Sequence, residues 1–595
     1  MTISHARSGA RILGLALVAL AIAVPTALAK PAKSKAKQSK TVPVQLLGFN
    51  DFHGQLEPPA GSAATIQGRL VGGAEYLATH VRELEKGNPN SVVVSAGDLI
   101  GATPLISAAF HDEPTIETMN KIGLDIGAVG NHEFDEGEAE LRRMAEGGCH
   151  PTDKAGTCKG QTGDFVGANF DILAANVVKR STGRPMFAPY AIKEFDGVKV
   201  GFIGMTLEGT PDIVSPGGIA DLRFLDEADT ANRYAKELKK RHQVKAVVVL
   251  LHEGGQQNPS TNVNLCNSPT GPIVDIVSRT SPAIDVFITG HTHQAYNCLL
   301  PNRDGEPVPV TSASAQGRVI SDIDLVVDRH SRDVTSVSAN NMLITRKAGD
   351  TDTGSLDVMK APDITALIAH YNSVIAPIRD RVIGRSTAVI SRNTGPDGGD
   401  ESPAGNLIAD AQLAASTSAP ANAVAAFMNP GGVRADFPAG DITYGAAFAV
   451  QPFGNNLTTI TLTGQQLYTM LKQQWCGLPS RRVLQPSNSV RYSYIPSKAV
   501  VTTTAPGTPC ASAPDDVISS FTINGESVPR DASRSYRITV NSFLADGGDG
   551  FSVLREGTDR IGGVVDTDAL EAYIAPSLTG APIAPPATDR ITPAS

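Results

Sequence analysis

Gly130-Asn131-His132-Glu133-Phe134-Asp135 follows Asp125-Ile126-Gly127-Ala128-Val129, a short apolar run that predicts a buried strand. In open α/β sheets, ligands bind at the carboxyl ends of the strands. The polar residues of the hexapeptide are therefore expected to emerge at such an end, in a position suited to chemistry.

Four other segments repeat this pattern of an apolar run followed by polar residues. The runs are 42–49, 91–95, 247–251 and 285–289, and the residues that follow them include Asp51, His53, Asp98, His252, His291 and His293. A single Asp or His after a strand is more often a helix cap or a satisfied polar group. Five such ends in one chain instead predict a rim that carries carboxylate, carboxamide and imidazole groups.

These side-chain types predict a metal centre. Divalent ions bind carboxylate oxygen and neutral imidazole nitrogen, and a pair of ions about 4 Å apart needs a bridging carboxylate with further ligands on either side. The rim supplies both kinds of group.

Five motifs follow one another along the chain. They are Asn50-Asp51-Phe52-His53-Gly54, Gly97-Asp98, Gly130-Asn131-His132-Glu133, His252 and Gly290-His291-Thr292-His293. In this order they resemble the motifs of the calcineurin-like metallophosphoesterases and, more narrowly, of the bacterial 5′-nucleotidase family. The resemblance extends from about Val42 into the last hundred residues.

The resemblance implies two sets of metal ligands that share Asp98 as a bridge. One ion would be held by Asp51, His53, Asp98 and His293, and the other by Asp98, Asn131, His252 and His291. The two divalent ions would be Zn, Mn, Mg or Co, and they would offset the phosphate charge and activate a shared hydroxide near neutral pH. Some relatives carry Gln where this chain has His293, a departure that leaves the number of ligands intact but could alter the metal preference.

His132 is expected to face the phosphate rather than the metals. An imidazolium there can stabilise developing charge or protonate the leaving oxygen, and Asp135 is placed to orient it. In the alternative interpretation Asp135 caps a helix and His132 is idle. Glu133 belongs to the motif, but no chemistry is assigned to it.

The region beyond residue 382 carries the residues expected to recognise the substrate. By resemblance, Phe453 and Phe543 would stack on a nucleobase, Asn455 would bind its edge, Asp549 would accept from ribose hydroxyls and Arg434 would meet phosphate. A lone Phe is usually core, but both of these lie beside Gly-rich turns.

One departure from some relatives concerns an additional arginine. These relatives carry it just before the segment that corresponds to Pro403-Ala404-Gly405-Asn406, where this chain has Gly398-Gly399-Asp400-Glu401. Arg392 is close enough in sequence to compensate only weakly. The substrate's phosphate number is therefore left open.

The chain of 595 residues is long enough for two or more domains. Apolar runs alternate with helical stretches such as 72–85, 114–122 and 226–241, which predicts an α/β class. The fold expected from the resemblance is a four-layer αββα metallophosphoesterase sandwich followed by a smaller α+β substrate-binding domain. A helix over 362–379 should connect the two, with one apolar face formed by Ile364, Leu367, Ile368, Tyr371, Val374 and Ile375.

The predicted segments cover the whole chain. They are a signal peptide over 1–29, a Lys-rich disordered spacer over 30–40, a metallophosphoesterase domain over 41–346, a linker with the connecting helix over 347–380, a 5′-nucleotidase C-terminal domain over 381–580 and a tail over 581–595. The first segment has basic residues, an apolar stretch over 12–24 and Ala27-Leu28-Ala29 as a cleavage site, so we expect a periplasmic or extracellular protein. An uncleaved anchor is the alternative, but the stretch is short for a membrane span, and none is expected in the mature chain.

The six cysteines agree with export. Proximity favours the pairs Cys149–Cys158, Cys266–Cys298 and Cys476–Cys510, although fifteen connectivities exist in principle. A metal–thiolate site is the alternative, but no Cys-x-x-Cys occurs and an oxidising compartment favours disulfides.

These observations predict an exported 5′-nucleotidase that releases nucleoside and phosphate from a nucleotide substrate. The same site could serve a 2′,3′-cyclic-nucleotide phosphodiesterase or a UDP-sugar hydrolase. A secreted binding protein on an inactive phosphoesterase fold is the alternative of another class, and the complete ligand set argues against it. The net charge of −9, with its only dense basic run at 30–40, excludes a nucleic-acid polymer as partner. The chain is expected to be a monomer.

Overall fold

The computed structural model describes residues 39–594, apart from 60, 155, 215, 258–261, 347–358, 394–400, 476–480 and 500–515. The predicted signal peptide and nearly all of the Lys-rich spacer lie outside the described residues, as does much of the predicted linker. Within the described ranges, no helix is both long and apolar enough to cross a membrane.

Two six-stranded sheets form the first part of the fold. The order of the first is β16 (Val334–Leu343), β15 (Val319–Asp328), β1 (Thr41–Phe49), β4 (Ser91–Ser95), β5 (Ile126–Ala128), β6 (Asp171–Leu173). The order of the second is β13 (Ala295–Pro301), β14 (Pro307–Ala313), β12 (Val286–Thr289), β11 (Ala246–His252), β9 (Val198–Thr206), β8 (Tyr190–Phe195). Strands β1, β4, β5 and β6 run parallel, as do β9, β11, β12 and β14.

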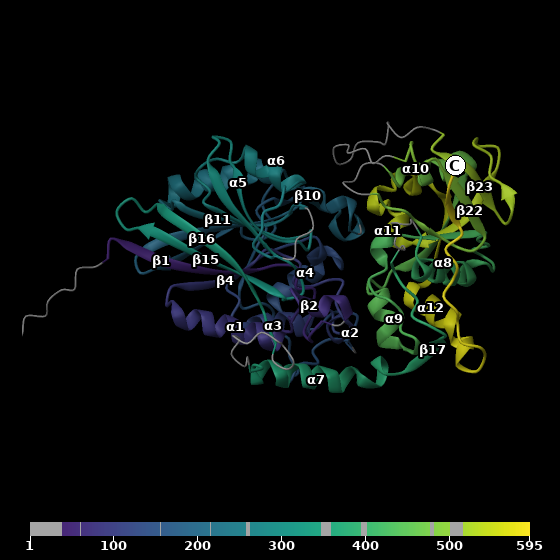
Figure 1. Ribbon diagram of the computed structural model, residues 1–595, viewed down its shortest axis with the longest axis horizontal. Helices are drawn as coiled ribbons and strands as arrows, with labels where there is room; N and C mark the ends of the chain where they lie inside the picture. The colour runs from purple at the N-terminus through teal and green to yellow at the C-terminus, as the bar shows by residue number, and fades with distance from the viewer. Residues whose placement is uncertain are drawn as a thin grey trace, which may run out of the picture. The chain divides into compact units, whose positions relative to one another are not determined.

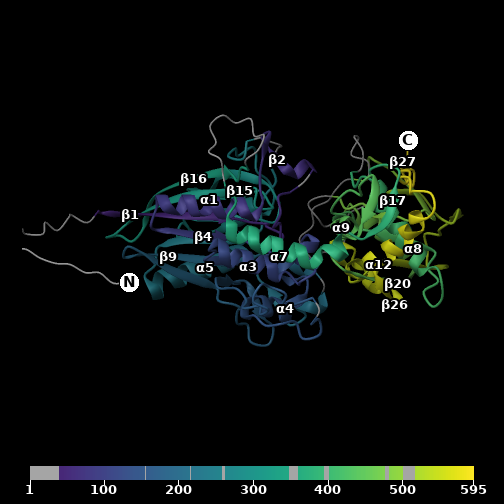
Figure 2. The same cartoon turned by 90° about the horizontal axis from the view of Figure 1, so that it is seen from below.

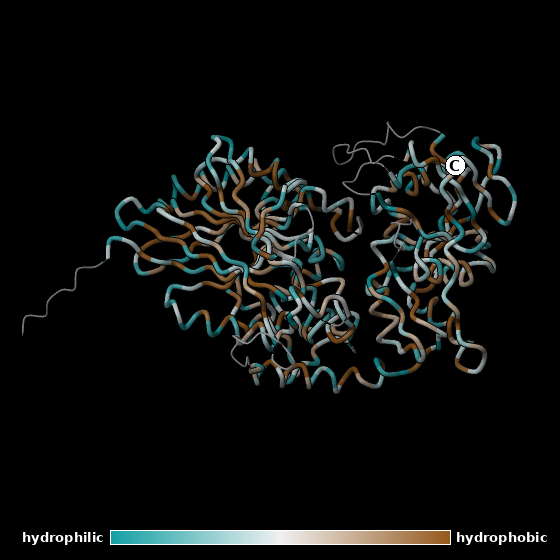
Figure 3. The backbone as a smooth tube through the Cα atoms, in the orientation of Figure 1, coloured by the Kyte–Doolittle hydropathy of each residue, from teal (hydrophilic) through white to brown (hydrophobic). Residues whose placement is uncertain are grey.

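The two sheets pack face to face over a core of aliphatic side chains. This core includes Leu46, Val248 and Ile288, none of which is exposed. A glycine allows one close approach, since a Cβ at Gly48 would lie 3.0 Å from the Cδ1 atom of Ile288. The central strands are apolar along their length because both of their faces are covered, as the brown tube in Figure 3 shows.

Helices cover the outer face of each sheet. Helices α1 (Ala74–Gly87), α3 (Glu113–Ile122) and α7 (Pro362–Arg379) share one core cluster with the first sheet. Helices α5 (Glu227–Glu237) and α6 (Pro272–Arg279) pack on the second. Figures 1 and 2 show this layering, and it confirms the predicted four-layer αββα sandwich.

The predicted helices differ from the observed ones in detail. The connecting helix α7 has the predicted bounds, but Val374 was wrongly placed on its buried face and is 40% exposed. The stretch 226–241 forms α5 only as far as Glu237 and continues as a π-helical turn over Leu238–His242.

The second part of the fold is a mixed α+β structure, as predicted. A five-stranded sheet has the order β21 (Gln485–Pro486), β18 (Ala425–Met428), β25 (Ser535–Asn541), β20 (Asn456–Thr463), β26 (Thr558–Val565). A smaller sheet has the order β24 (Glu526–Ser527), β23 (Ile518–Ile523), β22 (Val490–Tyr494), β27 (Ile591–Pro593). Helices α8 (Pro403–Ser416), α10 (Gly464–Gln473) and α12 (Asp566–Ile574) contact strands of the five-stranded sheet.

Two of the three predicted disulfides are present. Cys149 is bonded to Cys158, and Cys266 is bonded to Cys298. The third pair, Cys476 and Cys510, lies outside the described residues and stays a prediction.

The loop closed by Cys149 and Cys158 is also held by His111. The Nδ1 atom of His111 lies 2.6 Å from Oε2 of Glu136, and its Nε2 atom lies 3.2 Å from Oδ2 of Asp153. The imidazole ring stacks on that of His150, with 4.6 Å between the ring centroids. The hydrogen bond to Glu136 raises the pKa of His111 to about 9, against the opposing effect of burial.

The raised pKa of His111 predicts a pH-dependent contribution to stability. Because this pKa is about 9 in the folded chain and about 6.5 in the unfolded chain, the stabilisation is complete below the unfolded value and is lost as the pH rises through the folded one. The loss of Tm caused by His111→Asn should therefore be larger near pH 6 than above pH 9. His330→Asn, at an exposed histidine, is the control, and an equal loss of Tm at both pH values would contradict the prediction.

Candidate active site

Five parallel strands deliver the predicted ligands to one place. Asp51, Asp98 and Asn131 follow β1, β4 and β5 of the first sheet, and His252 and His291 end or follow β11 and β12 of the second. The strand ends of the two sheets meet there, since the backbone N–H of His291 donates to both carboxylate oxygens of Asp51, at 3.1 and 3.0 Å.

One group of potential ligands consists of Asp51, His53 and His293. One ligand atom from each lies within 4.8 Å of the others. The Nε2 atom of His293 is 3.3 Å from Oδ1 of Asp51 and 3.0 Å from Nε2 of His53. These are the residues that the resemblance assigned to one ion together with Asp98.

A second group consists of Asp98, His252 and His291, again with ligand atoms within 4.8 Å of one another. The Nε2 atom of His252 is 2.9 Å from Oδ2 of Asp98, and Nδ1 of His291 is 3.0 Å from Oδ1 of Asn131. The same Asp98 oxygen lies 3.8 Å from Nε2 of His53. Asp98 therefore occupies the position between the two groups that a bridging ligand requires.

The orientation of the imidazoles fits a metal centre. The Nδ1 atoms of His53 and His252 face the carbonyl oxygens of Gly101 and Ala96, at 2.9 and 2.7 Å, so each donates its hydrogen there. Each Nε2 atom then offers a lone pair to the site, the arrangement found for histidine ligands. The Nε2 atom of His252 is buried and faces Oδ2 of Asp98.

The electrostatics of the rim also favour a cation. Burial lowers the pKa of His53 and that of His291 to about 3, which keeps both imidazoles in the neutral form that binds metals. Burial opposes protonation of His252 as well, but the neighbouring Asp98 raises its pKa to about 10. The negative charge of Asp98 therefore favours a cation beside it.

The backbone is strained at the same residues. The left-handed φ angles of five predicted ligands are 49° at Asp51, 48° at His53, 51° at Asp98, 69° at His291 and 56° at His293. Non-glycine residues with such angles are uncommon and cluster at functional sites. The packing is equally tight, since a Cβ at Gly130 would lie 2.1 Å from Oδ1 of Asp98.

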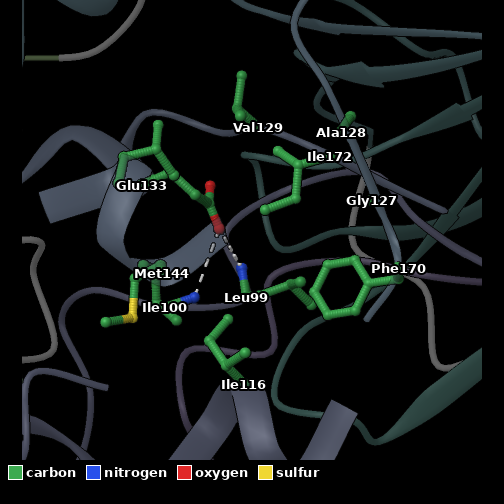
Figure 4. A pocket seen from close by; sticks show the side chains of 11 residues that line it. Leu99, Ile100, Ile116, Gly127, Ala128, Val129, Glu133, Met144, Phe170 and Ile172 are labelled. Carbon is green, nitrogen blue, oxygen red and sulfur yellow. Dashed lines mark hydrogen bonds between the residues drawn. The ribbon is translucent and has the colours of Figure 1, made fainter. Parts of the chain in front are cut away.

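Glu133 anchors the backbone of the loops that carry Asp98 and Gly130, a role that was not predicted from the sequence. Its buried carboxylate accepts hydrogen bonds from the backbone N–H groups of Asp98 at 3.0 Å and Leu99 at 2.8 Å, and from that of Gly130. Figure 4 shows this carboxylate among apolar side chains that include Ile116 and Phe170. Burial raises the pKa of Glu133 to about 7.

Two more supporting residues were not predicted, because Ser314 is distant in sequence from Asn50 and the Gly101 partner of Asp112 lies in a loop. Asn50 donates to Oδ2 of Asp51 at 2.6 Å and to the carbonyl of Ser314 at 2.7 Å. Asp112 accepts from the backbone N–H of Gly101 at 3.0 Å, the residue whose carbonyl contacts His53. Both fix the loops that carry the ligands.

His132 and Asp135 form the predicted pair. The Nδ1 atom of His132 is 2.7 Å from Oδ2 of Asp135, and its backbone N–H donates to Oδ1 of Asp98 at 3.0 Å. Burial disfavours the charged imidazole, but Asp135 and Asp98 raise the pKa of His132 to about 9. The ring of Phe453 lies 6.0 Å from that of His132.

Two residues predicted to recognise the substrate lie at one edge of the five-stranded sheet, where Asn455 precedes β20 and Phe543 follows β25. Asn429, which was not predicted, follows β18 at the same edge. Phe543 is partly buried and packs over a glycine, since a Cβ at Gly548 would lie 2.4 Å from its Cζ atom. The guanidinium of Arg434 lies 5.9 Å from the centre of the Phe453 ring.

Asp549 is buried at the same edge and has protein partners that were not predicted. Its two carboxylate oxygens accept from Nδ2 of Asn429 and from Nη1 of Arg482, both at 2.9 Å. The pattern gave no signal for Arg482, which lies in a separate loop. Arg392, expected to compensate only weakly for the additional arginine of some relatives, donates to the carbonyl of Arg434 at 2.6 Å.

The rim holds one more group with ligand atoms within 4.8 Å of one another, His53, Asp98 and His132, and two further clusters of ligand-type side chains lie away from the rim among the described residues. The first contains His111, Glu136 and His150, but its imidazole planes differ by only 6° and are stacked. Because imidazole lone pairs lie in the ring plane, two such rings cannot direct them at one ion. The second contains Glu208, Asp226 and Glu227, and Asp226 is already paired with Arg279 at 2.8 Å.

Comparisons with known proteins agree with this geometry. Residues 44–295 match the model of the calcineurin-like phosphoesterases, and residues 382–556 match the 5′-nucleotidase C-terminal domain. The chain is 32% identical to the cell wall protein Lmo0130 of Listeria monocytogenes over 573 residues, which cover 90% of this chain and 67% of that protein. It is 26% identical to a 5′-nucleotidase of Vibrio cholerae, with 93% of this chain and 95% of the relative covered.

A solved structure supports the same conclusion for the fold. The 5′-nucleotidase precursor from Thermus thermophilus superposes with a TM-score of 0.71 at 26% identity, covering 93% of this chain and 99% of that one. The predicted resemblance is confirmed: the chain belongs to the 5′-nucleotidase family of calcineurin-like metallophosphoesterases, which are metal-dependent phosphoester hydrolases.

Proposed function

We propose that the protein is an exported 5′-nucleotidase, which hydrolyses the 5′-phosphate ester of a nucleotide to nucleoside and phosphate with two divalent ions. The observation that carries the proposal is the convergence of both ligand groups on Asp98, with the His132–Asp135 pair beside them. Export is supported by the signal-like sequence over 1–29 and by a relative described as a cell wall protein.

The rim residues are suited to hold two ions. Asp51, His53 and His293 would hold one, and Asn131, His252 and His291 the other, with Asp98 shared between the two groups. Divalent ions bound there supply charge that offsets the phosphate dianion and acidifies water near neutral pH.

His132 is placed to serve the leaving group. Since Asp135 accepts the Nδ1 hydrogen, a protonated ring carries its other hydrogen on Nε2. Hydrolysis breaks the bond between phosphorus and the ester oxygen, water supplies the new P–O bond, and the leaving oxygen needs a proton. His132 would donate that proton from Nε2.

The second part of the fold would bind the nucleoside. Phe453 and Phe543 offer ring faces to a base, Asn455 offers a carboxamide to its edge, and Arg434 matches the geometry of phosphate oxygens. Asp549 would accept from ribose hydroxyls while Asn429 and Arg482 hold its carboxylate in place.

A substrate panel tests the proposal. The products would be measured after chelation and re-addition of Mn²⁺ or Zn²⁺: phosphate from AMP and from p-nitrophenyl phosphate, the ring-opened nucleoside monophosphate from 2′,3′-cyclic AMP, and UMP with glucose 1-phosphate from UDP-glucose. AMP should have the highest kcat/KM, and chelated enzyme should be inactive. A preference for the cyclic or sugar substrate would replace the proposed activity by the corresponding alternative.

His132→Gln should slow hydrolysis of AMP by roughly 10² to 10⁴, the usual effect of removing a positioned acid or base. Bound metal should remain at the wild-type level, because no metal ligand is removed. Rates and metal content are measured on the same preparation. Loss of metal would make His132 a ligand, and an unchanged rate would make it a bystander.

Phe453→Ala or Phe543→Ala should raise KM for AMP by roughly 5- to 150-fold, since stacking on one base contributes about 1–3 kcal/mol. Hydrolysis of p-nitrophenyl phosphate provides the comparison, because this ester has no base to stack. If both substrates lost the same factor in kcat/KM, the two phenylalanines would be structural core.

Glu133→Gln should weaken metal binding about 10- to 100-fold, the usual cost of losing a partner behind a metal ligand. The amide would present hydrogens to backbone N–H groups that now donate to a carboxylate. The dissociation constant for Mn²⁺ is the measurement, and Glu146→Gln at an exposed position of helix α4 (Gly137–Glu146) is the control. Equal affinities in both variants would show that Glu133 does not support the ligand loop.

A further inference from the structure

Asn455 lies where three strands of the five-stranded sheet end. Strand β20 pairs with β26 so that Asn456 faces Val565, and it pairs with β25 so that Leu457 faces Asn541. The antiparallel register therefore brings Asn455 next to the first residues after β25 and β26. These residues are Ser542 and Asp566.

Both neighbours lie beside the carboxamide of Asn455. The hydroxyl of Ser542 donates to Oδ1 of Asn455 at 3.2 Å. The side chain of Asn455 also lies close enough to the carboxylate of Asp566 to lower its pKa. The backbone adds a further link, since the N–H of Asp566 donates to the carbonyl oxygen of Asn455 at 2.8 Å.

Asp566 is itself firmly placed. Asp566 is only 2% exposed. Its Oδ1 atom accepts a hydrogen bond from the backbone N–H of Thr567 at 2.8 Å, in the first turn of α12. Burial raises the pKa of Asp566 to about 7, and the hydrogen bonds from Thr567 and Asn455 oppose this rise. Above that pH the group is a carboxylate that only accepts hydrogen bonds.

The two partners differ in what they impose on Asn455. A carboxylate has no hydrogen to give, so only the NH₂ end of the carboxamide can face Asp566. The hydroxyl of Ser542 can donate or accept by rotating, so it adapts to either orientation. Asp566 alone therefore distinguishes the nitrogen end from the oxygen end. One N–H and one oxygen lone pair of the Asn455 carboxamide then remain available to a base, with the donor and the acceptor at fixed positions.

We propose that Asp566 is a positioning residue that fixes the carboxamide of Asn455 and thereby makes the site discriminate between 6-amino and 6-oxo purine nucleotides. This inference rests on the proposed function, in which Asn455 binds the edge of the base. A 6-amino purine presents a donor at position 6 beside a ring acceptor, whereas a 6-oxo purine presents an acceptor at position 6. A carboxamide held in one orientation matches one of these patterns and opposes the other.

The test compares kcat/KM for AMP and IMP near pH 8.5, where Asp566 is ionised. Wild-type enzyme should prefer one of the two. Asp566→Asn preserves shape but offers either an N–H or an oxygen to Asn455, so the AMP to IMP ratio should move toward one by about three- to tenfold, the effect of one neutral hydrogen bond. Asp568→Asn, which removes an exposed carboxylate from the same helix, should leave the ratio unchanged.

Two further variants keep the test decisive if Asp566→Asn folds poorly. Asn455→Ala should move the ratio toward one as well, because the carboxamide is removed. Ser542→Ala should preserve the ratio, since Asp566 still selects the orientation. A wild-type ratio of one, an unchanged ratio in Asp566→Asn or Asn455→Ala, or an equal shift in Ser542→Ala would overturn the inference.

Ribose 5-phosphate separates this inference from the proposed function. If wild-type enzyme hydrolyses AMP no better than ribose 5-phosphate, base recognition is absent, and both proposals are overturned. If AMP is strongly preferred over ribose 5-phosphate but the AMP to IMP ratio does not respond to Asp566→Asn, only the positioning role is overturned.

Discussion

The carboxylate of Asp98 is the interaction on which the rest of the site depends. One of its oxygens lies within reach of an imidazole from each sheet, His53 beside β1 and His252 at the end of β11. Its other oxygen accepts the backbone N–H of His132, and its own N–H is held by Glu133. The side chain of Asp98 thus contacts both ligand groups and the residue that carries the acid–base imidazole. Displacing it would disturb the two ligand groups and the His132–Asp135 pair.

This arrangement explains why the fold needs two sheets packed closely together. Each sheet supplies only part of the rim, and the register of their contact determines whether the parts meet. Small residues such as Gly48 and Gly130 allow the required approach, because a Cβ at either position would crowd a side chain of the opposing sheet or the bridging carboxylate. The core between the sheets is therefore as much a part of the site as the ligands are.

Local patterns, together with the family resemblance of the motifs, were enough to predict the αββα class, the strand ends, two disulfides and the connecting helix α7, because each depends on residues close together in sequence. The placement of Val374 was wrong because a helix of 18 residues buries only a limited arc of its surface. Glu133, Asp112, Arg482 and Asp566 went unrecognised as supporting residues for a different reason. Each acts on a neighbour brought near by folding, and an isolated acidic or basic residue carries no sign of its partner.

The left-handed backbone at the rim ligands has a consequence for the lifetime of the protein. Conformations of this kind raise the energy of the folded chain, and a ligand that binds only the folded form offsets that cost. The cation is then a component of the fold as well as of the catalyst. When divalent metal is scarce, the rim loops of this enzyme would open more often to proteases, so that metal supply governs the amount of enzyme as well as its turnover.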